Sequence, residues 1–220
     1  MEISINAQIA SLCPQLRLVS LEAAVEIKPS PVGLLEEIET NSLGIAKRPM
    51  EEIKDIPAIA ASRRAYKTMG KAPSRYRLSA EALRRRIVKG GALYQISNVV
   101  ESINLTSLNS GFSIGGYDAD KIEGNIDLSL GRADDVYEAI GRGQLNIENL
   151  PVFRDAEGAF GSPTSDSVRT CITETTGRIL LIFLDFESDE TVFEAVSLCE
   201  RLLRTHCQAS ELRQHSISAS

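Results

Sequence analysis

Residues 98–130 read NVVESINLTSLNSGFSIGGYDADKIEGNIDLSL, and the spacing of their apolar side chains changes part-way along. Before Gly111 the spacing is helical, and Asn98 with Glu101 has the arrangement of a helix-capping box. The apolar face of this helix consists of Val99, Val100, Ile103 and Leu108. After Gly111 the period is two, because residues 125–130 alternate between polar and apolar, which predicts a half-buried strand.

The sequence on either side extends this pattern. Further strands are expected at residues 16–27, 136–140, 151–153, 169–172 and 178–186, the last being the strongest because residues 179–184 are all apolar. Other helices are expected to begin at Pro31, to span residues 50–69 with an interruption near Pro57, to run from Ser79 to Gly90, and to run from Ser188 or Asp189 to about Cys207. Residues 155–158 predict a hairpin turn. Helices, then short strands, then a helix indicate an α+β fold with mixed or antiparallel sheets flanked by helices.

The composition is that of one ordinary globular domain. The chain has 220 residues, of which 43% are hydrophobic and 25% charged. No apolar run approaches the roughly 18 residues of a membrane span, and the first residues lack the features of a signal peptide. We therefore expect a cytoplasmic protein with no membrane partner. The four cysteines form no CxxC pair and are expected to be buried thiols: Cys13, Cys171, Cys199 and Cys207.

Charge is distributed unevenly along the chain. The formal net charge is −6, yet residues 63–89 contain ten Lys or Arg residues and a single acid, Glu81. A basic stripe on an acidic protein is typical of a polyanion-binding surface, and it is equally typical of a solvated helix face. Composition alone leaves both interpretations open.

Few residues suit the common catalytic schemes. The only histidines are His206 and His215, so general-base catalysis by histidine is not expected. His206 and Cys207 have no second cluster to complete a tetrahedral metal site. The sequence also lacks a phosphate-binding glycine loop. We therefore expect no metal and no cofactor.

Two other features could form a pocket or serve the fold alone. Gly115 and Gly116 would permit close approach of a ligand to the backbone, or would form a bulge. Asp118 lies at a strand-to-loop corner, where an aspartate usually accepts backbone hydrogen bonds. The polar residues 165–176 either line a pocket or form a turn before the next strand.

Five motifs in order point to a family. They are Tyr66-Lys67-x-x-Gly70-Lys71, Tyr76-Arg77-x-Ser79-x-Glu81-Ala82-Leu83-x-Arg85-Arg86, Val100-Glu101-x-x-Asn104-Leu105-x-Ser107-Leu108, Gly116-Tyr117-Asp118-x-Asp120-Lys121-Ile122-x-Gly124, and Asp166-x-x-Arg169-x-x-Ile172-Thr173-Glu174-x-Thr176. Over about residues 60–205 the chain resembles a free-standing form of the B3/4 domain of the bacterial phenylalanyl-tRNA synthetase β subunit. The resemblance implies a layered α+β fold around an editing pocket, which in the synthetase hydrolyses tyrosine wrongly attached to phenylalanine tRNA.

The resemblance also implies which residues form the site. The predicted pocket consists of Asn104, Gly115, Gly116, Tyr117, Asp118, Arg169, Thr170 and Glu174. Gly115 and Gly116 would present backbone to the substrate, and Arg169 would anchor an anion, orient Asp118 by an ion pair, or simply form a buried ion pair. The chain departs from the synthetase at Gly115, where the synthetase has a histidine, and near Val168, where it has a glutamate. Relatives often carry asparagine in place of Ser97.

The resemblance therefore implies an editing-type module that binds aminoacyl-tRNA and hydrolyses a mischarged ester in trans, without DNA as a partner. The predicted contacts with RNA phosphates are Lys71, Arg75, Arg77, Arg84, Arg85 and Arg86. The alternatives are a non-catalytic module that binds a free amino acid or small amine, and an RNA-binding protein with a vestigial pocket. Residues 61–208 would form the B3/4-like domain, residues 1–60 would pack on it, and residues 209–220 would be a flexible tail.

Overall fold

The fold is built on two four-stranded sheets in the computed structural model, which describes residues 2–219. The first sheet has the order β1 (Ile3–Ile5), β4 (Ile126–Leu130), β7 (Pro151–Asp155), β8 (Gly158–Gly161), with β1 parallel to β4 and the other pairs antiparallel. The second sheet is antiparallel throughout, in the order β10 (Ser210–Ser218), β2 (Arg17–Ala24), β9 (Arg178–Asp185), β3 (Ser113–Asp118). A small ribbon pairs β5 (Glu138–Ala139) with β6 (Gly143–Gln144). The predicted α+β class is confirmed.

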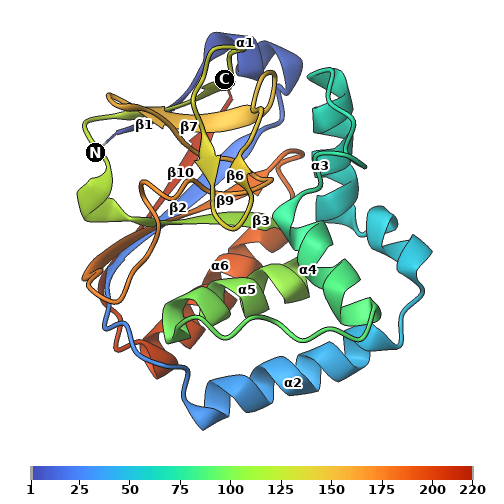
Figure 1. Cartoon of the computed structure of the whole chain (residues 1–220), viewed down its shortest axis with the longest axis vertical. Coiled ribbons are helices and arrows are strands. Elements are labelled where there is room, and N and C mark those ends of the chain that lie inside the picture. The colour runs from blue at the N-terminus through green and yellow to red at the C-terminus, as the bar shows by residue number, and fades with distance from the viewer. Residues whose placement is uncertain (1, 220) are drawn as a thin grey trace.

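Helices pack around the two sheets. They are α1 (Ala7–Leu12), α2 (Val32–Ala46), α3 (Pro57–Thr68), α4 (Ser79–Val88), α5 (Asn98–Ser110) and α6 (Thr191–His206), with 3-10 turns η1 (Met50–Asp55) and η2 (Ala119–Lys121). In Figure 1, α5 and α6 lie below the sheets and α2 runs along the outer edge beneath them. The predicted interruption near Pro57 is confirmed, because η1 stops just before it and Pro57 begins α3. No helix within the described residues is long and apolar enough to cross a membrane.

Strand β9 holds the layers together because both of its faces are buried. Ile179, Leu181 and Phe183 pack with side chains of α5 and α6, whereas Leu180, Ile182 and Leu184 pack with the first sheet. A central strand covered on both faces reads as a continuous apolar run rather than an alternating one. The unbroken run of residues 179–184 is therefore explained by its position between two cores.

Three segments differ from the sequence predictions. Residues 210–218 do not fray, because they form β10, which pairs along β2 from Ala24 to Arg17. Residues 169–172 do not form a strand; this irregular segment contributes the Thr170 carbonyl oxygen, which accepts a hydrogen bond from the Asp118 N–H. The strand predicted at residues 136–140 shortens to the two residues of β5.

Candidate functional site

A pocket of about 440 Å³ opens beside the first turn of α5. Its walls come from the segment after β2, the loop before α5 and the loop before β9, and are formed by Ile27, Lys28, Pro29, Ile96, Ser97, Ile172, Thr173 and Glu174. Among the eight residues predicted from the sequence for the pocket, only Glu174 lines it. The pocket combines one exposed carboxylate, one exposed ammonium group and two hydroxyls with four apolar side chains.

Buried hydrogen bonds fix the start of α5 at this pocket. Ser97 is the N-cap residue, and its hydroxyl accepts a hydrogen bond from the Val100 N–H at 3.3 Å. The Glu101 carboxylate accepts from the Ile96 and Ser97 N–H groups and from the Ser30 hydroxyl. The predicted capping box is therefore wrong by one residue, since Ser97 and not Asn98 is paired with Glu101.

The Asn98 side chain instead joins three segments of the chain. Its oxygen accepts a hydrogen bond from the Lys28 N–H at 3.0 Å, and its amide nitrogen donates to the carbonyl oxygens of Glu26 and His206 at 2.9 Å each. These bonds tie the exit of β2 and the end of α6 to the first turn of α5. The wall of the pocket that carries Lys28 is consequently held in place.

Asp118 positions the loop that carries Glu174. The Thr176 hydroxyl donates a 2.7 Å hydrogen bond to Asp118, and the Thr173 N–H donates to the Thr176 oxygen at 2.9 Å. Asp118 also accepts from the Asp120 N–H and lies 3.5 Å from the Lys121 ammonium nitrogen. It is buried and does not line the pocket, so its contacts are those of a residue that shapes the loop.

Gly115 and Gly116 meet side chains of the protein itself. A Cβ added to Gly115 would overlap the Tyr117 hydroxyl, and one added to Gly161 would overlap it from β8. A Cβ on Gly116 would lie 2.9 Å from Ile103 Cδ1 in the core beneath α5. Gly115 is therefore accounted for by close packing against Tyr117, and neither glycine of β3 lines the pocket.

Tyr117 is fully buried and reaches the carboxylate of Asp166, a residue of the fifth motif that was not among the predicted pocket residues. Its hydroxyl donates to Asp166 at 3.0 Å, and the Gly116 N–H donates to the same carboxylate at 3.4 Å. Part of Asp166 stays exposed, but burial of the carboxyl group raises its pKa to about 7. Burial, followed by the charge of Asp166, raises the pKa of Tyr117 well above its ordinary value. The polar run 165–176 was the sequence signal for this site.

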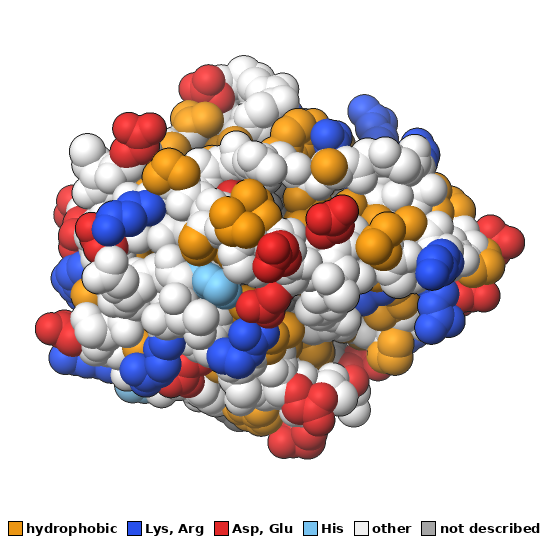
Figure 2. All heavy atoms as spheres, turned by 90° about the horizontal axis from the view of Figure 1, so that it is seen from below, with side chains coloured by type: hydrophobic (Ala, Val, Ile, Leu, Met, Phe, Trp, Pro, Cys, Tyr) orange, Lys and Arg blue, Asp and Glu red, His pale blue; other side chains and the backbone are white. Residues whose placement is uncertain are grey.

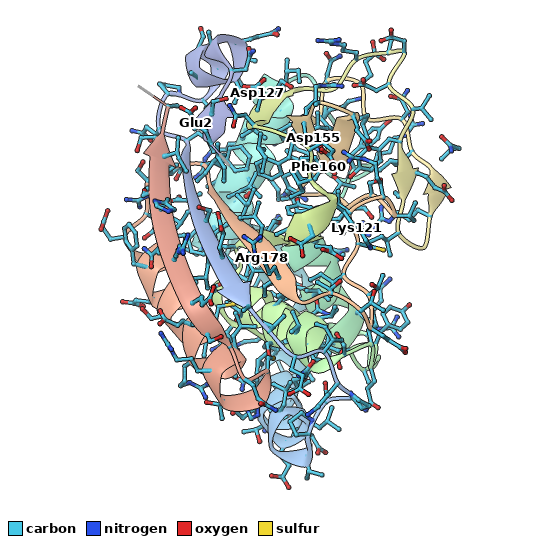
Figure 3. The ribbon with its side chains drawn as sticks, turned by 90° about the vertical axis from the view of Figure 1, so that its left-hand side faces the viewer. Glu2, Lys121, Asp127, Asp155, Phe160 and Arg178 are labelled. Atoms are coloured by element: carbon cyan, nitrogen blue, oxygen red, sulfur yellow. The ribbon has the colours of Figure 1, made fainter. Side chains whose placement is uncertain are left out.

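Arg169 neutralises a buried carboxylate from the β7–β8 hairpin. Its guanidinium lies 2.7 Å from Asp155 and 3.2 Å from Glu157, in the region where Figure 3 labels Asp155, Phe160 and Lys121. Burial opposes ionisation of Asp155, but hydrogen bonds from Arg169 and from the Glu123 N–H outweigh it and lower the pKa. Of the three roles considered for Arg169, the structure has the ion pair, and its partner is Asp155 rather than Asp118.

Comparison with known proteins places these residues in a family. The B3/4 domain family matches residues 61–199, which include the α5 pocket except for the segment 27–29. The chain belongs to the B3/4 domain family. A search of curated proteins found no match.

Among solved structures, this B3/4 domain is similar to an N-terminal fragment of the phenylalanyl-tRNA synthetase β-subunit from Pyrococcus horikoshii. The sequence identity is 12%, the TM-score is 0.49, and the match covers 97% of this chain and 50% of that one. The chain thus spans half the length of that fragment.

The remaining predicted pocket residues of this B3/4 domain lie outside the pocket. Asn104 is half-buried on α5. Thr170 is fully buried, and its hydroxyl has no hydrogen-bond partner among the described residues. The described residues also contain no group of three or more His, Cys, Asp or Glu side chains arranged to hold a metal ion.

The basic stripe of the B3/4 domain surrounds a buried acid. Glu81 is only 2% exposed and lies 2.7 Å from Arg63, 3.7 Å from Arg77 and 3.6 Å from Arg85. A buried carboxylate needs such partners, since removing them leaves an uncompensated charge. Arg77 and Arg85 therefore contribute to the fold even if they also contact a ligand.

The other predicted RNA contacts differ in how many contacts their side chains make within the protein. Arg84 donates to the Asn109 carbonyl oxygen at 2.9 Å, and burial, with a smaller effect of Arg48, lowers its pKa. Lys71 and Arg75 are different: both lie over the Tyr76 ring, at 4.5 and 5.6 Å from its centroid. Neither has an acidic partner among the described residues, so these two cations are available to a polyanion.

Proposed function

We propose that this B3/4 domain binds aminoacyl-tRNA, takes the aminoacyl group into the α5 pocket and hydrolyses mischarged esters in trans. The observation that carries the proposal is the pocket itself, which lies, apart from the segment 27–29, within the part of the chain that matches the family and presents a carboxylate and two hydroxyls. The substrate class comes from the five sequence motifs by which the chain resembles the B3/4 domain of the phenylalanyl-tRNA synthetase β subunit, part of an enzyme that acts on tRNA.

Glu174 is the group suited to recognise the substrate's ammonium group. The amino group of an aminoacyl ester is protonated near neutral pH, and a carboxylate gives it a charge-assisted hydrogen bond. Glu174 is exposed and has no ion-pair partner among the described residues, so its carboxylate is free to do so. The adjacent hydroxyls of Ser97 and Thr173 supply hydrogen bonds along the pocket wall.

Hydrolysis would require a water molecule to attack the ester carbonyl carbon. The C–O bond to the ribose then breaks, the ribose oxygen takes a proton, and the free amino acid leaves. The Val99 and Val100 N–H groups of α5 already have side-chain acceptors, so they are not free to stabilise an oxyanion. The chemistry we propose rests on positioning the ester and water, with the hydroxyls of the pocket and of the ribose assisting.

The second candidate function is binding of a free amino acid. Lys28, whose ammonium nitrogen also lies 2.8 Å from the Glu26 carboxylate, and Glu174 line the same pocket, and their opposite charges match the carboxylate and ammonium groups of a zwitterion. An aminoacyl ester has no free carboxylate. Lys28→Met is therefore expected to weaken binding of a free amino acid while leaving ester turnover nearly unchanged.

A deacylation panel tests the proposal. The purified protein is incubated with correctly and incorrectly charged tRNAs, and loss of the ester is followed over time. Glu174→Gln should reduce turnover at least tenfold, whereas Glu123→Gln, an exposed acid outside the pocket, should not. If the protein does not raise the rate of ester loss above the spontaneous rate for any of these tRNAs, the catalytic proposal fails and amino-acid binding becomes the better account.

A further inference from the structure

A second and larger recess lies on the other side of the loop that borders the α5 pocket. It has a volume of about 530 Å³ and runs between α2, the end of α4 and residues 90–95. Its apolar walls are formed by Leu35, Ile38, Leu43, Ala46, Ile87 and Leu93. Figure 2 views the molecule from the α2 side, where hydrophobic side chains adjoin acidic ones. We call this recess the α2 groove.

Tyr94 gives the α2 groove an aromatic wall that is already oriented. Its side chain is 62% exposed, and the Arg86 guanidinium carbon lies 3.9 Å from the ring centroid. Arg86 also donates hydrogen bonds to the Tyr94 hydroxyl at 2.9 Å and to the Ala92 carbonyl oxygen. Arg86 lies over the ring and does not line the groove, whereas the exposed Tyr94 side chain does line it and can be reached by a flat ligand.

The polar groups of the α2 groove favour a ligand that donates hydrogen bonds. The Ser42 hydroxyl is buried with no partner among the described residues, and Glu39, three positions earlier on α2, also lines the groove. Glu101 also lines the groove, but its oxygens already accept from Ile96, Ser97 and Ser30. An apolar slot with an aromatic wall and these acceptors suits a planar base that carries an exocyclic amino group.

The position of the groove relative to the α5 pocket identifies the source of such a base. One short loop separates the two, because Gly90 to Gln95 line the groove while Ile96 and Ser97 line the pocket. In a charged tRNA a single ribose links the ester to the terminal adenine. We propose that the α2 groove binds this terminal adenine, stacked on Tyr94, while the ester occupies the α5 pocket. The inference rests on the proposed function.

The test is a comparison of two RNAs with two proteins. Binding of the full-length protein to an intact uncharged tRNA is compared with binding to the same tRNA lacking its terminal adenosine. Stacking of one base on an aromatic side chain predicts that trimming raises Kd about tenfold. Tyr94→Ala should raise Kd for the intact RNA by a similar factor and have no further effect on the trimmed RNA. Tyr94→Phe should bind as the wild type does.

Tyr76→Ala is the matched control. Tyr76 is also covered by cations but does not line the α2 groove, so this variant should affect both RNAs equally or neither. If Tyr94→Ala weakens both RNAs equally, or weakens neither, the inference is overturned while deacylation of charged tRNA can still stand. If neither RNA binds at all, the proposed function is refuted together with the inference.

A free adenine nucleotide carries the same base as the terminal adenosine of the RNA, so it could bind the α2 groove in the same way. Binding of adenosine 5′-monophosphate is therefore measured by saturation-transfer NMR with the wild type and Tyr94→Ala. Weak binding that requires Tyr94, together with a tenfold effect of trimming, supports the inference. Binding that requires Tyr94 without any effect of trimming overturns it in favour of a free nucleotide.

Discussion

Adding one methyl group at Gly115 tests whether this glycine serves the protein's own packing. In Gly115→Ala the new Cβ would overlap the Tyr117 hydroxyl, and it would lie 2.5 Å from the ring carbon that bears it. Tyr117 has no room to retreat, because it is fully buried with Phe160 at 4.9 Å and Phe153 at 6.1 Å between ring centroids. Moving the ring would also break its hydrogen bond to Asp166.

The cost follows from these two effects. Overpacking a dense core costs about 1–3 kcal/mol, and losing a hydrogen bond to a carboxylate costs about 1.5–3 kcal/mol. We therefore expect Gly115→Ala to lower the free energy of unfolding by about 3–5 kcal/mol, or Tm by about 10 °C for a chain of this size. Urea unfolding followed by far-UV circular dichroism measures the first quantity and a thermal scan the second.

Two further variants test whether this loss of stability comes from the contact between the new methyl group and Tyr117. Gly44→Ala lies in α2 with open space around its Cβ, so it should be neutral or raise stability by up to about 1 kcal/mol. In a Tyr117→Phe background the hydroxyl is gone, so Gly115→Ala should cost less than it does in the wild type. A loss below about 1 kcal/mol in the wild type, or an equal loss in both backgrounds, would refute the packing explanation of Gly115.

Three other predictions concern charged groups. Burial raises the pKa of Asp166 to about 7, so the native state holds this proton more tightly than the unfolded state does. As pH rises from about 4 to about 7, the free energy of unfolding of the wild type should therefore fall relative to that of Asp166→Asn. Parallel curves of unfolding free energy against pH for the two proteins would contradict this. Arg169→Gln should cost about 3–5 kcal/mol in urea unfolding because it leaves the buried Asp155 without its ion-pair partner, and a loss under about 1 kcal/mol would show that the N–H groups of Glu123, Glu157 and Gly158 suffice to hold this carboxylate. Replacing Lys71 and Arg75 with Gln should reduce the slope of log K against log salt for tRNA by about 1–2 without changing Tm, whereas an unchanged slope would place the RNA elsewhere.

Secondary structure was predictable where local pattern and tertiary position agree. The run of residues 179–184 is apolar because β9 is buried on both faces, so this run alone was enough to predict the strand. Strand β10 was missed because its side chains are mostly exposed and polar, and its order comes from backbone pairing with β2. Backbone pairing leaves no mark on the composition of an edge strand.

The site was only partly predictable because its walls are distant in sequence. Glu174 was found from the polar run that contains it, but Lys28, which lines the same pocket, lies 146 positions earlier in the chain. Gly115 shows a different limit. A glycine that admits a ligand and one that admits the side chain two residues later are identical in sequence, and only the position of Tyr117 separates them.

The strand order β10-β2-β9-β3 also constrains when this protein can fold during its synthesis. Strand β2 ends at Ala24, but its partner β9 begins at Arg178 and its other partner β10 at Ser210. A nascent chain must therefore carry an unpaired β2 while more than 150 further residues are added, before either neighbour exists. Such long-range pairing is slow and exposes strand edges to other chains. We expect the yield of native protein to depend on chaperones that shield nascent chains.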